Sequence, residues 1–246
     1  MKLTHGLAAL ALALATTAAQ AELTGTITGV SDYDFRGITQ TGHDPALQGS
    51  IDYSHESGFY VGAWASSSLD FGGCCDENWE LDTYGGFRGG DAVTYDVGAI
   101  YYSYPGTSVN VDYPEIYAGV GWQWLSGKVW YSPDFGSTGD TAWYYEVNGN
   151  WSLPANFGVS AHIGYSDGDY WDSAYNGSYS DWSVGVTYAL GHFTLGLKWI
   201  DGSDLEDLDD FCPGNSCGNI SKDPFSTDAR AVFSVSTTFP WTKEGE

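Results

Sequence analysis

The chain has few basic residues. Its 246 residues include 8 Lys and Arg against 32 Asp and Glu, which gives a formal net charge of −24. Nucleic-acid-binding proteins need a basic surface to meet the phosphates, so this scarcity excludes that class. Charged residues of both signs make up only 16% of the chain, while aromatic residues make up another 16%. Disordered chains are poor in aromatic residues, and helical bundles need far more Ala, Leu, Glu and Lys, so neither class fits.

Long apolar runs are absent after the first segment. Lys2 precedes an apolar run at residues 7–15, and Ala19-Gln20-Ala21 forms a small-x-small cleavage site. These features are typical of a secretory signal peptide, predicted over residues 1–21 and followed by one domain over residues 22–246. No later stretch reaches the ~20 apolar residues of a spanning helix. We therefore expect an exported protein that is either free in an extracytoplasmic space or inserted in an outer membrane as a β-barrel.

Alternating polarity is the main local pattern. Leu47, Gly49, Ile51 and Tyr53 alternate with polar residues, which is typical of a strand with one apolar and one polar face. The same period recurs clearly at residues 79–88, 116–124, 157–165, 182–190, 193–199 and 229–235, and less clearly at 23–35, 58–67, 91–104, 128–135 and 142–152. The pattern predicts about 12 strands of about ten residues, the length that crosses a bilayer at the tilt of a barrel.

The connections alternate in length. Short links such as Glu56-Ser57, Gly89-Gly90 and Leu190-Gly191-His192 are interleaved with long polar links such as residues 68–77 and 201–227. Transmembrane barrels have short turns on one side and longer loops on the other. The fold predicted is all-β: an antiparallel up-and-down barrel of about 12 strands with short periplasmic turns and longer extracellular loops. The alternative is an exported soluble β-sandwich, which has no reason to sort its loops in this way.

One family resemblance supports this fold. The stretch SDYDFRGITQT (31–41) is followed by PALQG (45–49), IDYSHESGFY (51–60) and ELDTYGG (80–86). These motifs resemble those of the TorF-type porin family of proteobacteria. The resemblance implies an outer-membrane barrel with a porin-like role and without established catalytic residues. The chain departs from the usual ending of such barrels, because residues 240–246 follow the predicted final strand that ends at Phe239.

Four cysteines lie in predicted exterior loops, and they are Cys74, Cys75, Cys212 and Cys217. An even number of cysteines in an exported protein favours disulfides. A local bridge from Cys212 to Cys217 and cross-links between the two loops are both open alternatives. No Cys-x-x-Cys spacing or neighbouring His is present, so we predict no metal site.

Charged residues on the polar faces are the candidate functional residues. They are Arg36, Asp52, Glu80, Asp82, Arg88, Glu115, Glu146, Lys198 and Arg230. One interpretation is a charged constriction that selects ions by sign. The other is a network of internal ion pairs that closes the barrel. We favour a narrow pore, and the excess of acids predicts a preference for cations. Arg36 lies near the predicted exterior end of the first strand and could instead only fasten the rim.

The function predicted is passive, porin-like diffusion of small hydrophilic solutes or cations across a bacterial outer membrane. The expected partners are the permeating solutes, outer-membrane lipid and lipopolysaccharide. The alternative is a non-conducting surface barrel whose loops bind a partner or stabilise the envelope. Ser160 and His162 share a polar face, but no Gly-x-Ser-x-Gly turn accompanies them, so we predict neither enzymatic activity nor a cofactor.

Overall fold

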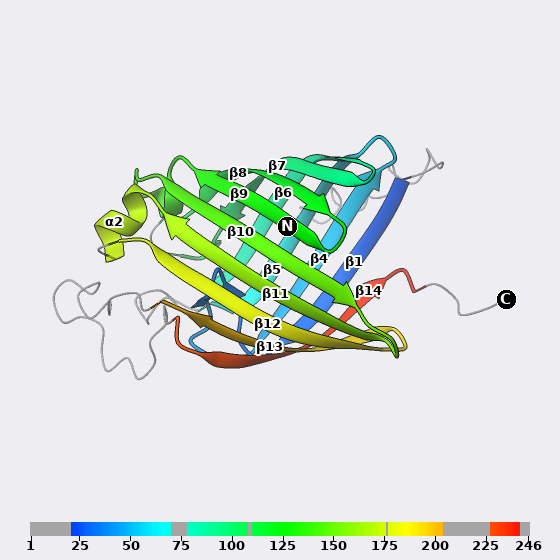
Figure 1. Ribbon diagram of the computed structural model, residues 1–246. Coiled ribbons are helices and arrows are strands. Elements are labelled where there is room, and N and C mark those ends of the chain that lie inside the picture. The colour runs from blue at the N-terminus through cyan, green and yellow to red at the C-terminus, as the bar shows by residue number, and fades with distance from the viewer. Residues whose placement is uncertain (1–20, 70–77, 108–109, 176, 204–226, 242–246) are drawn as a thin grey trace, which may run out of the picture.

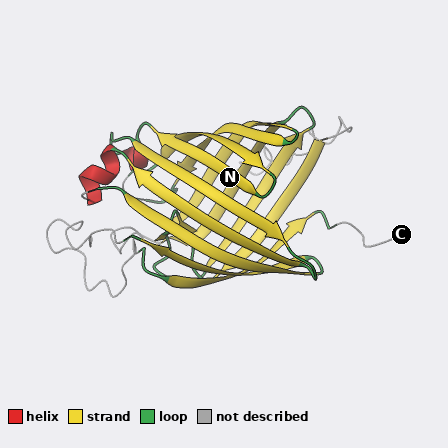
Figure 2. Ribbon diagram, in the orientation of Figure 1, coloured by secondary structure: helices red, strands yellow, loops and turns green. Residues whose placement is uncertain are grey.

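The computed structural model describes residues 21–69, 78–107, 110–175, 177–203 and 227–241. The predicted signal peptide, except its last residue, lies outside the described residues, as do all four cysteines. The described chain is almost entirely strands (Figure 2), and the helices among its residues are η2 (Phe135–Ser137) and α2 (Asp169–Tyr175). No described helix combines the length and apolar character needed to span a membrane.

Twelve antiparallel strands close into one barrel, as the sequence predicts (Figure 1). In chain order these strands are β1 (Ala21–Val30), β4 (Ala46–His55), β5 (Phe59–Leu69), β6 (Asn78–Gly90), β7 (Val93–Ser103), β8 (Tyr113–Trp122), β9 (Leu125–Ser132), β10 (Ala142–Ser152), β11 (Phe157–Asp167), β12 (Tyr179–Leu190), β13 (Phe193–Gly202) and β14 (Arg230–Phe239). Each strand pairs with its neighbour along the barrel, and β1 pairs with β14 to close it. No edge strand is left unpaired within this barrel, so the backbone hydrogen bonds are satisfied internally.

Apolar side chains cover the outside of the barrel. Leu23, Ile51, Ile116 and Ile163 are each more than half exposed, at 56–58%. A water-soluble sandwich would bury this face, whereas a membrane barrel presents it to lipid. The predicted alternation therefore produces a lipid-facing belt on one side of each strand and a polar lumen on the other.

Aromatic side chains gather toward both ends of this outer surface. Toward the short turns, Phe59 contacts Phe87 at 5.0 Å and Trp124 contacts Trp151 at 5.1 Å between ring centroids. Toward the long loops, Tyr131 lies 4.4 Å from Trp143. Such girdles place amphipathic rings at the two membrane–water interfaces.

The first long loop differs from its prediction. The alternation predicted a strand to residue 35, but β1 ends at Val30 and residues 31–45 turn into the barrel. We call residues 31–45 the inner loop. It contains a small hairpin of β2 (Asp34–Phe35) and β3 (Ile38–Thr39). The turn between them has positive φ at Arg36 (54°) and Gly37 (85°), a conformation that glycine adopts without strain.

Candidate functional site

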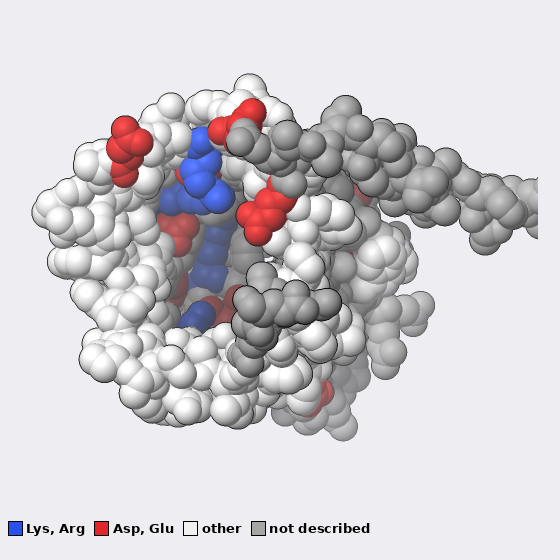
Figure 3. Space-filling model, turned by 90° about the vertical axis from the view of Figure 1, so that its right-hand side faces the viewer, with Lys and Arg blue, Asp and Glu red and all other residues white. Residues whose placement is uncertain are grey.

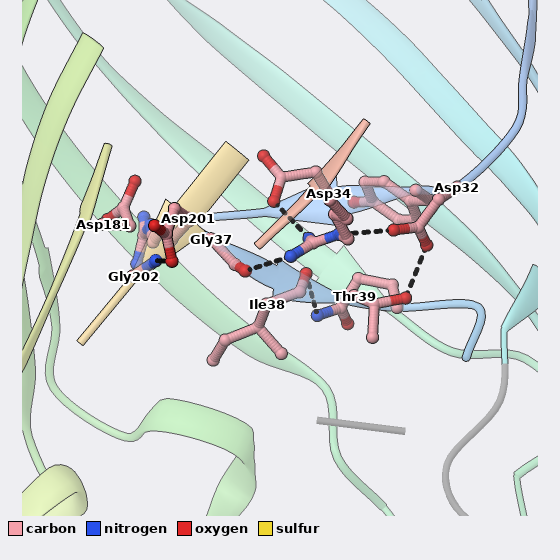
Figure 4. A network of polar contacts seen from close by, with 12 residues as sticks. Asp32, Asp34, Gly37, Ile38, Thr39, Asp181, Asp201 and Gly202 are labelled. Atoms are coloured by element: carbon pink, nitrogen blue, oxygen red, sulfur yellow. Dashed lines mark hydrogen bonds and ion pairs between the residues drawn. The ribbon is translucent and has the colours of Figure 1, made fainter. Parts of the chain in front are cut away.

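One wall holds the inner loop through a single arginine. Arg230 of β14 donates from Nε to Asp32 at 2.6 Å, from Nη2 to Asp34 at 2.7 Å and from Nη1 to the carbonyl oxygen of Gly37 at 2.9 Å. Figure 4 shows these three residues converging on one guanidinium. Thr39 also donates to Asp32, at 2.5 Å. These bonds fix the inner loop to the strand next to β1.

The opposite wall holds the tip of the inner loop. Arg36 donates two hydrogen bonds to Glu115 of β8, at 2.9 and 2.6 Å, and the two side chains are only 7% and 1% exposed. Tyr102 donates a third bond to Glu115 at 3.0 Å. The guanidinium also lies over the rings of Phe35 (4.7 Å) and Tyr144 (4.5 Å). Because β8 lies across the barrel from β14, the inner loop spans the lumen.

Apolar contacts pack the inner loop at the long-loop end. Tyr33 lies 5.3 Å from Trp64 of β5, and Ile38 is 4% exposed. Tyr179 of β12 donates to the carbonyl oxygen of Arg36 at 2.9 Å. These residues join one buried, mainly aromatic cluster, which also contains Tyr102, Tyr104, Tyr113, Phe135 and Trp171. The inner loop is therefore part of the packed core of this end.

Asp34 lies in the inner loop, outside the spanning strands. Burial raises the pKa of its carboxyl to about 6, with smaller increases from the negative charges of Asp181 and Asp32. The positive charges of Arg230 and Lys198 act in the opposite direction. Asp34 is therefore more readily protonated inside the barrel than it would be in water.

A second cluster occupies the half of the lumen near the short turns. Asp96 of β7 accepts a hydrogen bond from Tyr60 at 2.6 Å and pairs with Lys128 of β9 at 3.2 Å. Arg88 of β6 lies 3.8 Å from the same carboxylate. Tyr60 also bonds to Tyr117. These charges and rings fill the side of the lumen formed by β5 to β9.

Three tyrosine rings of this half lie directly over glycines. A Cβ at Gly86 would meet the Tyr60 hydroxyl at 2.5 Å, and one at Gly62 would meet the Tyr84 ring at 2.6 Å. A Cβ at Gly98 would likewise meet Tyr117 at 2.5 Å. Glycine is required at these positions because the rings occupy the space of the missing side chains.

A third group of polar contacts lies in the middle of the lumen. Glu146 of β10 accepts bonds from Trp130 and Asn148, both at 2.8 Å. The His162 ring contacts Asn148 at 2.7 Å and Asp181 at 2.9 Å. Ser160 is not among the hydrogen-bond partners found for His162 in the described part of the chain.

The lumen is hollow below the inner loop. Viewed from the short-turn end, Figure 3 shows an opening with acidic and basic side chains inside it. A cavity of about 360 Å³ near this end shares Glu146, Asn148 and Asn150 with a second cavity of about 420 Å³. The second cavity shares Asp34, Ser160 and Lys198 with a third of about 250 Å³. The three adjoining cavities extend from the short turns to the inner loop.

The structure separates the predicted site residues into two levels. Glu80 and Asp82 of β6 are 2% and 5% exposed, and lie with Glu115, Arg36 and Arg230 at the long-loop end. Three others line the cavities of the lumen, and they are Arg88, Glu146 and Lys198. Asp52 accepts hydrogen bonds from Ser50 at 2.8 Å and from Tyr84. Their role in permeation stays a prediction.

Several lumen residues are not among those predicted from the sequence. Asp96, Lys128 and Asp181 occupy inward positions in their strands and hold the clusters together. Each lies at a polar-face position of an alternating strand, so the alternation could have identified it as a lumen residue. Among the described residues, no group of three or more His, Cys, Asp or Glu side chains has a geometry that could hold a metal ion.

A family model described as "Bacterial protein of unknown function (Gcw_chp)" matches residues 14–239. The chain belongs to this family. No curated protein matches it significantly. Two solved structures that resemble this member of the family are porins. The NanC porin has a TM-score of 0.55 with 9% identity, over 88% of this chain and 99% of the porin. The KdgM porin, solved in complex with disordered oligogalacturonate, has a TM-score of 0.52 with 9% identity, over 89% of this chain and 100% of the porin. At this identity the likeness shows a porin-like barrel fold.

Proposed function

We propose that the chain is an outer-membrane channel for passive diffusion of small hydrophilic solutes or ions. The observation that carries the proposal is a hollow, polar lumen inside a closed barrel with an apolar outer belt. Such a barrel is stable only where lipid covers the belt, so the location proposed is the bacterial outer membrane, reached through the predicted signal peptide. The resemblance to the TorF-type porins supports the same role. No catalytic role is proposed for Ser160 or His162.

A preference for cations is part of the proposal. Nine carboxylates line or fill the lumen, and they are Asp32, Asp34, Asp52, Glu80, Asp82, Asp96, Glu115, Glu146 and Asp181. Five basic side chains face them, which leaves an excess of four acids (9 − 5) when all are ionised. An acidic lumen raises the local concentration of cations, and salt screens the effect.

A non-conducting barrel is the second candidate, and the inner loop is the observation that favours it. The Arg36–Glu115 pair and the aromatic cluster occupy the long-loop end of the lumen. If this end never opens, the loops and their contacts with lipopolysaccharide or another partner would carry the function instead.

Liposome swelling distinguishes the two candidates. Vesicles that contain the folded protein should swell in isotonic arabinose, and more slowly in larger sugars, because diffusion through a narrow lumen depends on solute size. Vesicles without protein and vesicles with heat-unfolded protein are the controls. A swelling rate equal to that of empty vesicles would refute the channel.

The reversal potential in a KCl gradient tests the cation preference. Glu146→Gln combined with Asp52→Asn removes two carboxylates from the inward faces of β10 and β4 and should reduce the preference. Glu80→Gln combined with Asp82→Asn is the matched double variant, because those two carboxylates are buried at the long-loop end of the barrel. We expect the first pair to change the reversal potential more than the second. Equal potentials in both pairs and the wild type would contradict the assignment.

A further inference from the structure

Lys198 of β13 differs from the other basic residues of the lumen. The described chain contains five Lys and Arg, and four of them pair with carboxylates: Arg36, Arg88, Lys128 and Arg230. Lys198 is exposed to the lumen and, within the described part of the chain, makes no ion pair or hydrogen bond. An ammonium group without a fixed partner is free to bind an anion.

A recess lies beside Lys198. The register places Ser160, Gly185 and Lys198 side by side on β11, β12 and β13. A Cβ at Gly185 would lie 2.7 Å from the Ser160 hydroxyl oxygen and 3.8 Å from Cγ of Lys198. The Ser160 hydroxyl therefore occupies the space over Gly185 and lies beside the stem of Lys198. All three residues line the cavity of about 250 Å³, which is the recess. The Ser160 hydroxyl also lacks a hydrogen-bond partner among the described residues.

The carboxylates around this recess already have partners. Asp34 is held by Arg230 at 2.7 Å, and Asp181 contacts His162 at 2.9 Å. Glu146 accepts hydrogen bonds from Trp130 and Asn148. Within the described part of the chain none of these three carboxylates forms an ion pair with Lys198, so its ammonium group stays available to an anion.

Polar side chains that can hydrogen-bond to the hydroxyl groups of a solute also line the two cavities that meet at Lys198. Asn148 and Asn150 line the larger cavity of about 420 Å³, and Ser160 lines both. A volume of this size is within the range of small-molecule sites. Amide and hydroxyl groups can each donate and accept hydrogen bonds, as the hydroxyl groups of a solute require.

We propose that Lys198, Ser160 and the recess that they line beside Gly185 form a binding site for the carboxylate of a small, hydroxylated organic anion. The inference rests on the proposed channel, because the anion reaches the site through the lumen. The site concentrates one class of solute inside a lumen whose overall charge attracts cations. Lys198 donates to the carboxylate, Ser160 donates a second bond, and Asn150 meets the hydroxyl chain.

Sodium gluconate is the probe, with sorbitol as the neutral control that has a similar hydroxyl chain without the carboxylate. In planar bilayers, gluconate should reduce the single-channel current in a saturable manner, and sorbitol should do so far less. Lys198→Gln should raise the half-blocking concentration about tenfold, the effect of losing one charge-assisted hydrogen bond. Lys128→Gln is the matched control, because it removes a lumen lysine that is already paired with Asp96. It should change block by less than about twofold, since its charge is already neutralised.

Two results would overturn the site while leaving the channel intact: equal block of the wild type and the Lys198→Gln variant, or equal block by gluconate and sorbitol. If no current is observed at all, the channel proposal fails.

Calorimetric titration of the detergent-folded protein with gluconate then tests the site directly. Heat of binding that is lost in the Lys198→Gln variant supports it, and no binding to the wild type refutes it. Different migration of boiled and unboiled samples on a detergent gel confirms that each variant folds.

Discussion

Glu115→Gln is expected to release the inner loop. The substitution keeps the size of the side chain but leaves the Arg36 guanidinium without a carboxylate at a position where both partners are almost fully buried. Removing one partner of a buried ion pair costs about 3–5 kcal/mol. The rings of Phe35 and Tyr144 remain in contact with Arg36 and retain part of its stabilisation, so we expect the lower end, about 3 kcal/mol.

This cost favours states in which the inner loop leaves its site and Arg36 reaches water. A change of about 3 kcal/mol multiplies the population of such states roughly 100-fold. In planar-bilayer recordings of the Glu115→Gln variant, a level of higher conductance should therefore occupy a much larger share of the recording time than in the wild type.

Two further variants make the reasoning testable. Arg36→Met combined with Glu115→Leu replaces the pair with apolar groups, which is often neutral for a buried pair, and should restore the wild-type current. Arg88→Gln breaks an exposed pair with Asp96, worth about 0–1 kcal/mol, away from the inner loop, and should not raise the share of time spent at the higher conductance level. Wild-type conductance in Glu115→Gln, or a double variant that stays open, would refute the role of this pair.

Three more predictions concern the barrel wall, the inner loop and the cysteines. Gly86→Ala should destabilise the barrel by about 1–3 kcal/mol in urea unfolding in lipid vesicles, because its Cβ would collide with Tyr60, whereas Gly29→Ala, with nothing within 4 Å, should not. Because burial raises the pKa of Asp34 in the folded barrel to about 6, the protonated carboxyl stabilises the inner loop fully below pH ~4, and this stabilisation is lost as the pH rises through about 6. The inner loop should therefore be held more firmly at pH 4 than at pH 7, and Asp34→Asn should weaken this pH dependence. Thiol titration of the unreduced, unfolded protein should find no free cysteine if the four cysteines form two disulfides; two or more reactive thiols would contradict this.

The strands could be predicted from the sequence because alternation is a local signal. Leu47 to Tyr53 indicate their own strand without reference to the rest of the chain. The sorting of short and long links then identified the barrel, and the closed sheet confirms it.

The inner loop could not be predicted in the same way. Its position depends on Arg36 meeting Glu115, 79 residues later, and on Arg230 meeting Asp32 across 198 residues. The same four residues are compatible with a solvated rim or a filled lumen. Positive φ at Arg36 and Gly37 identifies the turn only once the backbone is known.

Total charge was also an incomplete guide to the site. The formal charge of −24 predicts an acidic lumen, but all five described basic residues lie inside the barrel. Four of them pair with nearby carboxylates, whereas Lys198 has no such pair among the described residues, so a solute meets a local positive charge at Lys198 inside a lumen with an excess of acids.

The most direct test of the channel is single-channel recording of the purified, folded protein in a planar bilayer. The structure predicts discrete conductance steps on insertion, because a hollow lumen leads from the short turns to an inner loop held by a small number of ion pairs. A correctly folded barrel that inserts but shows no conductance at any voltage, in the wild type and in Glu115→Gln alike, would contradict the account.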